Sequence, residues 1–234
     1  MKKIFISITF LSLLTVFYSC ERDLETEGVS RITTYAVLTI NGAADTILPL
    51  NATWADPGIL VSTGDAYTTS GSVNTAVAGR YVLTYKAVNV DGFAALTERT
   101  VWVLESGDAT IDYSGTYQGG RGSTYSNSTG GDGTVVLTPI SGIPGTYICS
   151  DMFARYYEVF RAYGMAYRCY GMIRIVDATT FDNAGANVTF DSPWGDGLIL
   201  PGTSVIEGSG RLTYRLGWTD GSSVAASFFL EPTK

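Results

Sequence analysis

The sequence contains no histidine and little lysine, and these absences remove several kinds of chemistry. Without histidine there is no Ser-His-Asp or Cys-His pair to activate a nucleophile, and no zinc site with imidazole ligands. Beyond residue 20 the only lysines are Lys86 and Lys234. Catalysis would have to rest on carboxylates, tyrosines, arginines or a serine without an ordinary base. We therefore expect no catalytic residues, no bound metal and no cofactor.

Basic charge is scarce as a whole. Once residues 1–19 are removed, the chain carries 13 basic and 22 acidic residues, a net charge of −9. Since phosphate binding needs clustered lysine and arginine, nucleic acid is excluded as an expected partner. The 45% of hydrophobic residues suffice for real cores, and the 27 glycines favour turns over long helices. A length of 234 residues favours two compact units.

Residues 1–19 have the parts of an export signal. Lys2 and Lys3 precede an apolar run, Ile4–Tyr18, and a small residue, Ser19, stands before Cys20. The run is shorter than the roughly 20 residues of a membrane-spanning helix, so it is interpreted as a cleaved leader. It resembles the lipoprotein signals of Bacteroidetes, which implies lipidation of Cys20. The alternative is an ordinary secretory signal that happens to end in cysteine.

Residues 20–30 form a short acidic segment that contains Glu21, Asp23, Glu25 and Glu27. A dense charge run of this kind is typical of a solvated tether. Acidic residues directly behind the lipidated cysteine resemble the signal that sends Bacteroidetes lipoproteins to the outer face of the outer membrane. We therefore expect a lipid-anchored protein exposed at the cell surface, attached to the membrane through the anchor alone. The periplasmic leaflet is the alternative location.

Residues 31–105 read as short strands broken by turn residues. Strands are expected at Tyr35–Ile40, Arg80–Val90 and Leu96–Leu104, with turns at Asn41-Gly42 and Asp56-Pro57-Gly58. Several strands at this spacing within about 75 residues indicate a small β-sandwich of the immunoglobulin (Ig) type.

Four segments of this unit carry a family resemblance: LTING, WADPG, VNTAVAGRYVLTYKAVNVDG and RTVWV, at residues 38–42, 54–58, 73–92 and 99–103. They resemble the bacterial surface-protein Ig-like domain, whose members show a D-P-G turn, a G-x-Y-x-x-x-Y strand and a terminal R-x-V-x-V strand. The resemblance implies a spacer domain. Trp54 and Trp102 are expected to be buried or half-buried in it, as large aromatic residues usually are.

Residues 106–110 read as a short polar linker, and residues 111–234 as a second β-rich domain. Its consecutive strands and short turns predict an antiparallel meander, closed or nearly closed into a barrel, so that the fold class is all-β. The strands are expected at Thr134–Thr138, Thr146–Ser150, Ala166–Val176, Asn187–Phe190, Arg211–Trp218 and Ser223–Leu230.

The second domain also resembles a known module. SGTYQG, at residues 114–119, and SDMFARYYEVFRAYGMAYRCYG, at residues 150–171, are similar to the C-terminal module of a two-domain Bacteroidetes surface lipoprotein family of unknown function. In architecture that family is distantly similar to the SusE- and SusF-like glycan-binding lipoproteins of polysaccharide-utilisation systems.

The most unusual stretch of the chain runs from Tyr147 to Gly171. Eight of its 25 residues are Tyr or Phe, against an aromatic share of 12% in the whole chain. Residues 152–160 have helical spacing and could pack on the sheet, whereas residues 164–170 read as the beginning of a strand. The alternatives are core packing and a sugar-binding face, because a sugar ring stacks on aromatic rings while guanidinium and phenol groups bind its hydroxyls. The candidate binding residues here are Tyr156, Tyr157, Tyr163, Tyr167, Arg155 and Arg161.

Trp194 is the most distinctive single residue, since it stands in a loop of turn formers, DSPWGDG, which offers few neighbours to bury it. Exposure, at the surface or at an edge, and burial are equal alternatives for it. Asp191 and Asp196 flank it and could orient sugar hydroxyls. No segment matches the D-x-[DN]-x-[DN]-G pattern of a calcium loop, so no metal is assigned.

Cys149 and Cys169 border the aromatic stretch. In an oxidising compartment they could form a disulfide that closes this segment, worth about 3 kcal/mol for a loop of this size. The equal alternative is a pair of free buried thiols.

The sequence as a whole favours a surface-anchored, non-catalytic lipoprotein. Its expected partner is a polysaccharide or oligosaccharide, bound by the C-terminal domain as part of a polysaccharide-utilisation system. The second hypothesis is an accessory subunit that docks to an outer-membrane transporter or to another lipoprotein. The third is a glycoside hydrolase that uses two carboxylates.

Overall fold

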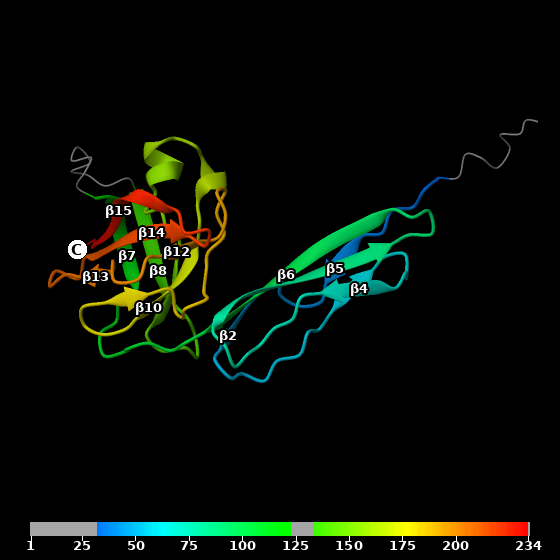
Figure 1. Cartoon of the computed structure of the whole chain (residues 1–234), viewed down its shortest axis with the longest axis horizontal. Helices are drawn as coiled ribbons and strands as arrows, with labels where there is room; N and C mark the ends of the chain where they lie inside the picture. The colour runs from blue at the N-terminus through cyan, green and yellow to red at the C-terminus, as the bar shows by residue number, and fades with distance from the viewer. Residues whose placement is uncertain (1–31, 123–132, 234) are drawn as a thin grey trace, which may run out of the picture.

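The computed structural model describes residues 32–122 and 133–233 of the chain. The predicted leader, Cys20 and the acidic tether lie outside the described residues. Two β-rich domains lie end to end in an elongated molecule (Figure 1), and the predicted all-β fold class is confirmed. Among residues 32–122 and 133–233, no helix has the length and hydrophobicity needed to cross a bilayer.

The N-terminal domain is a sandwich of two sheets. One sheet pairs β1 with β3, and the other has the order β2-β6-β5-β4, in which β2 runs parallel to β6. Ile59 and Val61 of one sheet pack against Leu83, Tyr85 and Ala87 of the other, because alternate residues of a strand face the same side. The strands are β1 (Leu38–Ile40), β2 (Asp45–Pro49), β3 (Ile59–Val61), β4 (Tyr67–Ser70), β5 (Gly79–Val88) and β6 (Ala94–Leu104).

The sequence motifs of this domain meet in one buried polar network. Arg99, which is 1% exposed, donates from Nε to the Tyr85 hydroxyl at 3.1 Å and lies 3.3 Å from Asp56. The Tyr85 hydroxyl donates in turn to Asp56 at 2.7 Å. The other Arg99 nitrogens donate to the carbonyls of Ala43, Asn41 and Gly58. Because a buried guanidinium needs such partners, the D-P-G turn, the second tyrosine of β5 and the arginine of β6 depend on one another.

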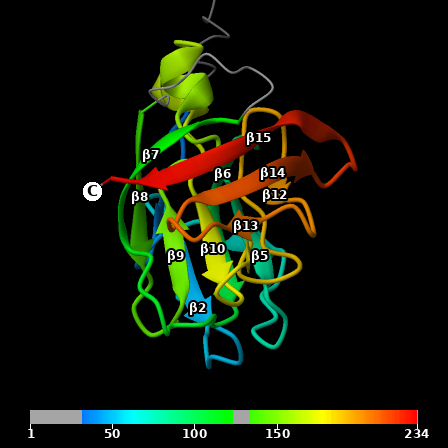
Figure 2. The same cartoon turned by 90° about the vertical axis from the view of Figure 1, so that its left-hand side faces the viewer.

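The C-terminal domain is built around one curled antiparallel sheet (Figure 2) with the strand order β11-β10-β9-β8-β7-β15-β14-β12, and β13 also pairs with β14. The sheet's two ends approach each other at β11 and β12, where the Asn183 side chain accepts from the Ile199 N–H at 2.8 Å and donates to its carbonyl at 3.2 Å. The strands are β7 (Gly115–Arg121), β8 (Gly133–Pro139), β9 (Thr146–Cys149), β10 (Gly171–Ile175), β11 (Phe181–Asp182), β12 (Gly197–Ile199), β13 (Val205–Ile206), β14 (Leu212–Trp218) and β15 (Ser223–Pro232).

Three expected strands differ clearly from the observed ones. The strand expected at Tyr35–Ile40 begins only at Leu38. The strand expected at Ala166–Val176 begins only at Gly171, because a 3-10 helix, η3 (Met165–Tyr167), precedes it. The strand expected at Asn187–Phe190 is reduced to two isolated bridges. Asn187 pairs with Gly79 of the Ig-like domain, and Phe190 pairs with Gly197 across a tight turn.

The two domains share a hydrophobic cluster and a bonded connection. Ala78, Trp102 and Leu104 of the Ig-like domain pack with Met172 and Val188 of the C-terminal domain. The connecting segment donates backbone hydrogen bonds from residues 105, 107 and 108 to residues 184, 144 and 175 of the C-terminal domain. The polar segment 106–110 is thus fastened to the domain that follows it. Trp54 is half-buried and Trp102 is 4% exposed, which confirms the burial expected for both.

Candidate functional site

Four aromatic side chains from four places in the chain meet at the surface of the C-terminal domain. Tyr157 comes from a π-helix, η2 (Tyr156–Phe160), Tyr167 from η3, Tyr163 from the turn between them, and Trp194 from the loop between β11 and β12. The Trp194 ring lies 4.5 Å from that of Tyr157 and 5.4 Å from that of Tyr167, and Tyr163 lies 6.0 Å and 5.1 Å from these two tyrosines, centroid to centroid. We call these four residues the aromatic platform. It remains open to solvent, since Trp194 is 44% and Tyr163 46% exposed.

Trp194 is held at the tip of a tight loop. Phe190 and Gly197 exchange backbone hydrogen bonds of 2.9 and 2.8 Å at the base of this loop. The Ser192 hydroxyl accepts from the Trp194 N–H at 3.2 Å and donates to the Gly195 carbonyl at 2.7 Å. The indole also meets the buried Phe153 ring edge-on at 5.5 Å. One side of Trp194 is therefore fixed by packing, and this orders the exposed ring in advance of any ligand.

The segment that carries the tyrosines has a strained start. Ala154 and Arg155 have φ values of 51° and 69°, a region that residues with a Cβ rarely adopt. The fully buried Asp151 side chain offsets this cost by accepting from the backbone N–H groups of Phe153, Arg155 and Cys169 at 3.0, 3.1 and 3.3 Å. Strained residues of this kind gather at functional sites, where the surroundings hold them in place.

The predicted helical spacing of residues 152–160 corresponds to η2, but its tyrosines differ in position. Tyr156 is buried, accepts a 2.8 Å hydrogen bond from Arg121, and lies outside the platform. Arg155 pairs with Glu158 at 2.9 Å instead of facing solvent. Arg161 is exposed beside the platform, with its guanidinium 3.4 Å from the Tyr163 hydroxyl.

Asp191 and Asp196 flank Trp194 in sequence but turn toward the other domain. Arg80 of β5 donates to Asp196 at 2.8 Å and lies 3.9 Å from Asp191. The structure thus separates the nine candidate sugar-binding residues into groups. Tyr157, Tyr163, Tyr167 and Trp194 form the platform with Arg161 beside it. Tyr156 packs against Tyr157, Arg155 pairs with Glu158, and Asp191 and Asp196 lie at the domain interface.

Cys149 and Cys169 are both free and buried, so the disulfide that was one of the two alternatives is not formed in the structure. In the register of β9 and β10, Cys149 lies opposite Gly171, and Cys169 precedes the strand. Burial raises the pKa of each thiol to about 12, which makes both poor nucleophiles.

Apart from the platform, a cavity lies where the two ends of the curled sheet approach each other. This cavity of about 750 Å³ is lined mainly by apolar residues, and the Arg174 side chain at its edge is already bonded to Glu105 and Asp182. Within the described ranges, no group of three or more Cys, Asp or Glu side chains is arranged to hold a metal ion. The aromatic platform therefore remains the surface best suited to a ligand.

Asp151 was not singled out by the sequence, although it holds the whole segment in place. The available signal was an acidic residue within a run of aromatic and apolar residues, directly after the strand that ends at Cys149. Asp in such a position commonly accepts from nearby backbone N–H groups.

Comparison with known proteins finds a family match for each domain. A family model for a C-terminal domain matches residues 106–229, and the model for the Ig-like domain of bacterial surface proteins matches residues 38–103. Among solved structures, the chain is similar to the lipoprotein BT2262 from Bacteroides thetaiotaomicron, with 22% identity over 85% of this chain and 100% of that one, and a TM-score of 0.39. None of the curated proteins matches the chain.

Proposed function

We propose that this protein is a surface-anchored, non-catalytic lipoprotein that binds a glycan. The chain belongs to the family whose C-terminal domain matches residues 106–229. The glycan lies across the aromatic platform, and the protein serves a polysaccharide-utilisation system. The anchor is a lipid on Cys20 in the outer membrane. The export signal that ends just before Cys20 supports the anchor, and the match to an Ig-like domain of bacterial surface proteins supports the location.

One observation carries the proposal: the aromatic platform combines exposed rings with a fixed position. Exposing apolar area to water is unfavourable, so a monomeric protein rarely gathers large aromatic side chains at one surface point without use for them. The exposed parts of the Trp194 and Tyr163 rings offer apolar surface for the C–H groups of a sugar, and the Arg161 guanidinium and the tyrosine hydroxyls offer hydrogen bonds to its hydroxyls.

The arrangement of the domains supports the same proposal. The described chain begins at the end of the Ig-like domain that is furthest from the C-terminal domain (Figure 1). An anchor at the N-terminus would therefore hold the platform away from the membrane by the length of the Ig-like domain. A spacer of this kind lets a bound polysaccharide pass without contact with the bilayer.

The proposal is tested by affinity electrophoresis of residues 21–234 through gels that contain soluble plant, fungal or host polysaccharides. We expect retardation by at least one of them, with an affinity near micromolar, about 8 kcal/mol. Trp194→Ala should weaken this binding at least about tenfold, roughly 1.4 kcal/mol, because the central ring of the platform is lost. The affinity is read from mobility against polysaccharide concentration.

Tyr35→Ala is the matched control. Tyr35 is also an exposed aromatic residue in contact with another, Phe93 at 5.4 Å, but it belongs to the Ig-like domain. This variant should bind like the unmodified chain. Both variants should unfold within a few degrees of it, since each removes a partly exposed ring. Equal binding by the Trp194→Ala variant, or unchanged mobility in every gel, would remove the glycan-binding proposal.

A second candidate function is docking to a protein such as an outer-membrane transporter. Its supporting observation is that Val159, Phe160 and Met165 are exposed beside the platform, with Met165 73% exposed. Apolar side chains that surround tyrosine and arginine are typical of protein interfaces. Capture of a defined transporter by the unmodified chain, with loss of capture by Phe160→Ser, would favour docking over glycan binding.

The third hypothesis, a glycoside hydrolase, needs two carboxylates in one cleft, and one such pair is present. Asp45 and Asp191 line the same cavity between the domains. A glycosidase, however, needs one carboxyl that is held protonated by burial, and the Asp191 side chain is 75% exposed. Release of reducing ends from a retarding polysaccharide, and its loss in Asp191→Asn, would restore this hypothesis.

A further inference from the structure

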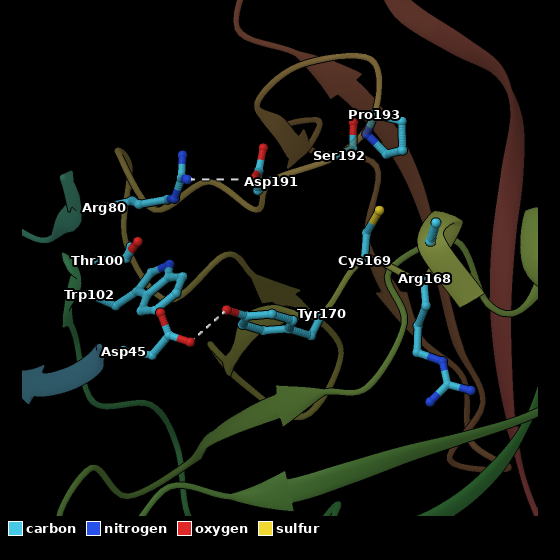
Figure 3. A pocket seen from close by; sticks show the side chains of 11 residues that line it. Asp45, Arg80, Thr100, Trp102, Arg168, Cys169, Tyr170, Asp191, Ser192 and Pro193 are labelled. Carbon is cyan, nitrogen blue, oxygen red and sulfur yellow. Dashed lines mark hydrogen bonds and ion pairs between the residues drawn. The ribbon is translucent and has the colours of Figure 1, made fainter. Parts of the chain in front are cut away.

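A cavity of about 460 Å³ lies between the two domains, apart from the aromatic platform (Figure 3). Its walls come from three strands of the Ig-like domain and two segments of the C-terminal domain. Its volume falls in the range of about 300–1,000 Å³ that is usual for small-molecule sites. It is distinct in position from the apolar cavity at the ends of the curled sheet.

The cavity is formed by firm contacts between the domains. The Arg80 N–H donates to the Asn187 carbonyl at 3.2 Å, and the Arg80 guanidinium pairs with Asp196 at 2.8 Å. Trp102, in one wall, belongs to the hydrophobic cluster that the two domains share. Its indole N–H lies 3.5 Å from the Thr189 carbonyl of the other domain. A site built on such contacts exists before the ligand arrives, so binding would require little ordering.

Its lining combines aromatic surface with hydrogen-bonding groups. The Trp102 and Tyr170 rings lie 5.8 Å apart, centroid to centroid, and Figure 3 shows the Tyr170 hydroxyl directed at Asp45, 3.4 Å from the carboxylate. Asp191 supplies a second, largely exposed carboxylate.

The charges in the cavity select against an anionic ligand. The two guanidinium groups in its lining are already paired, Arg80 with Asp196 and Arg168 with Glu158, the latter through two bonds of 2.8 Å. The lining itself carries two arginines and two aspartates, but once Asp196 and Glu158 are counted with their arginine partners, Asp45 and Asp191 leave the surroundings of the cavity negative. An incoming carboxylate or phosphate would meet repulsion, whereas neutral hydroxyl groups can donate to both carboxylates.

We propose that this cavity binds a short neutral saccharide, of one or two sugar units, as a second carbohydrate site. The class of ligand rests on the proposed function, because the platform and one side of the cavity are built from the same two segments of the C-terminal domain. Tyr167 and Trp194 face the platform, whereas their neighbours Ala166, Arg168 and Ser192 line the cavity. The end of a glycan on the platform thus lies next to a cavity suited to its terminal units.

The test is saturation-transfer NMR of residues 21–234 with glucose, galactose, mannose, xylose, N-acetylglucosamine, cellobiose and lactose. At least one of these sugars should bind. Asp191→Ala removes an acceptor, and Ala166→Met fills the cavity without adding an aromatic ring. Each change should weaken binding at least fivefold. Trp194→Ala should change it less than twofold, and so should the control Asp65→Ala, which removes a half-buried carboxylate of the Ig-like domain that does not line the cavity.

The outcomes separate this inference from the proposed function. Binding of a short sugar that neither cavity variant weakens would overturn the inference. Retardation in a polysaccharide gel without binding of any of the seven sugars would overturn it as well and leave the glycan-binding platform standing. Sugar binding that the cavity variants abolish, with no retardation in any gel, would support the cavity and overturn the platform. If no short sugar binds and no gel retards the protein, the cavity and the platform proposals are both overturned.

Discussion

Asp151 shows how much of the candidate site depends on a single buried carboxylate. Its three backbone hydrogen bonds hold the turn from which the aromatic segment starts. Burial raises the pKa of Asp151 to about 6, although the three N–H donors act in the opposite direction. The folded protein therefore binds a proton at this residue more tightly than the unfolded chain does, and the stability that Asp151 contributes depends on pH.

The first prediction concerns the difference in unfolding free energy between the unmodified chain and Asp151→Asn. The folded pKa of about 6 lies above the ordinary value of 3.8. The contribution of Asp151 is thus fully present below about pH 4 and is lost as the pH rises through 6, by about 3 kcal/mol at most. Asparagine cannot titrate, so the difference between the two proteins should fall over this interval.

Urea unfolding at pH 4, 5, 6 and 7.5 measures this difference. Val90→Ala is the control, because this exposed side chain carries no titratable group and its removal should leave the difference constant with pH. A difference for Asp151→Asn that does not vary with pH would contradict the pKa assigned to this residue.

At the scale of elements, the segment between the domains behaves as part of the C-terminal domain. Its N–H groups at residues 105, 107 and 108 bond to three separate parts of that domain. Gly107 fits there because it lacks a Cβ. A Cβ at this position would lie 2.3 Å from the Ile175 carbonyl oxygen and 2.6 Å from that of Gly145.

The second prediction is that Gly107→Ala lowers the free energy of unfolding by about 2–3 kcal/mol, since backbone must shift to admit the methyl group. For a chain of this size the melting temperature should fall by roughly 4–10 °C. Gly208→Ala is the matched control, because a Cβ there meets nothing within 4 Å. Equal melting temperatures for the two variants would show that the segment is loose.

At the scale of the whole molecule, the two domains are joined by packing as well as by the chain. Trp102 is 4% exposed and lies in the cluster that both domains share. A hydrophobic interface of this kind couples the stability of the two sides, in contrast to the more polar contacts of domains that move independently. The molecule is therefore expected to respond to heat as one unit.

The third prediction is a single calorimetric transition for residues 21–234, with equal calorimetric and van't Hoff enthalpies. Trp102→Ala should lower stability by about 3–5 kcal/mol and divide the transition in two, because it removes the largest side chain of the shared cluster. Trp54→Ala is the control, since Trp54 packs only in the Ig-like sandwich and should leave one transition. Two transitions in the unmodified chain would contradict the coupling.

Sequence alone determined the features that depend on neighbouring residues. Alternation and turn formers predicted the all-β class, and the D-P-G, tyrosine and arginine motifs predicted the Ig-like domain. For Trp194 the turn formers around it left exposure and burial as equal alternatives, and the side chain is exposed. The helical spacing of residues 152–160 likewise indicated the short η2. These signals are local, because strand period, turn geometry and helix spacing act over a few residues.

Only the tertiary structure decided which of the aromatic and acidic residues act together. Tyr156 and Tyr157 are adjacent in sequence, yet one is buried under Arg121 and the other faces Trp194. Asp196 meets Arg80, 116 residues away, across the interface between the domains, and Arg80 also lines the cavity there. Such partners are set by how whole faces of the two domains pack, and packing complementarity between distant segments leaves no periodic trace in the chain.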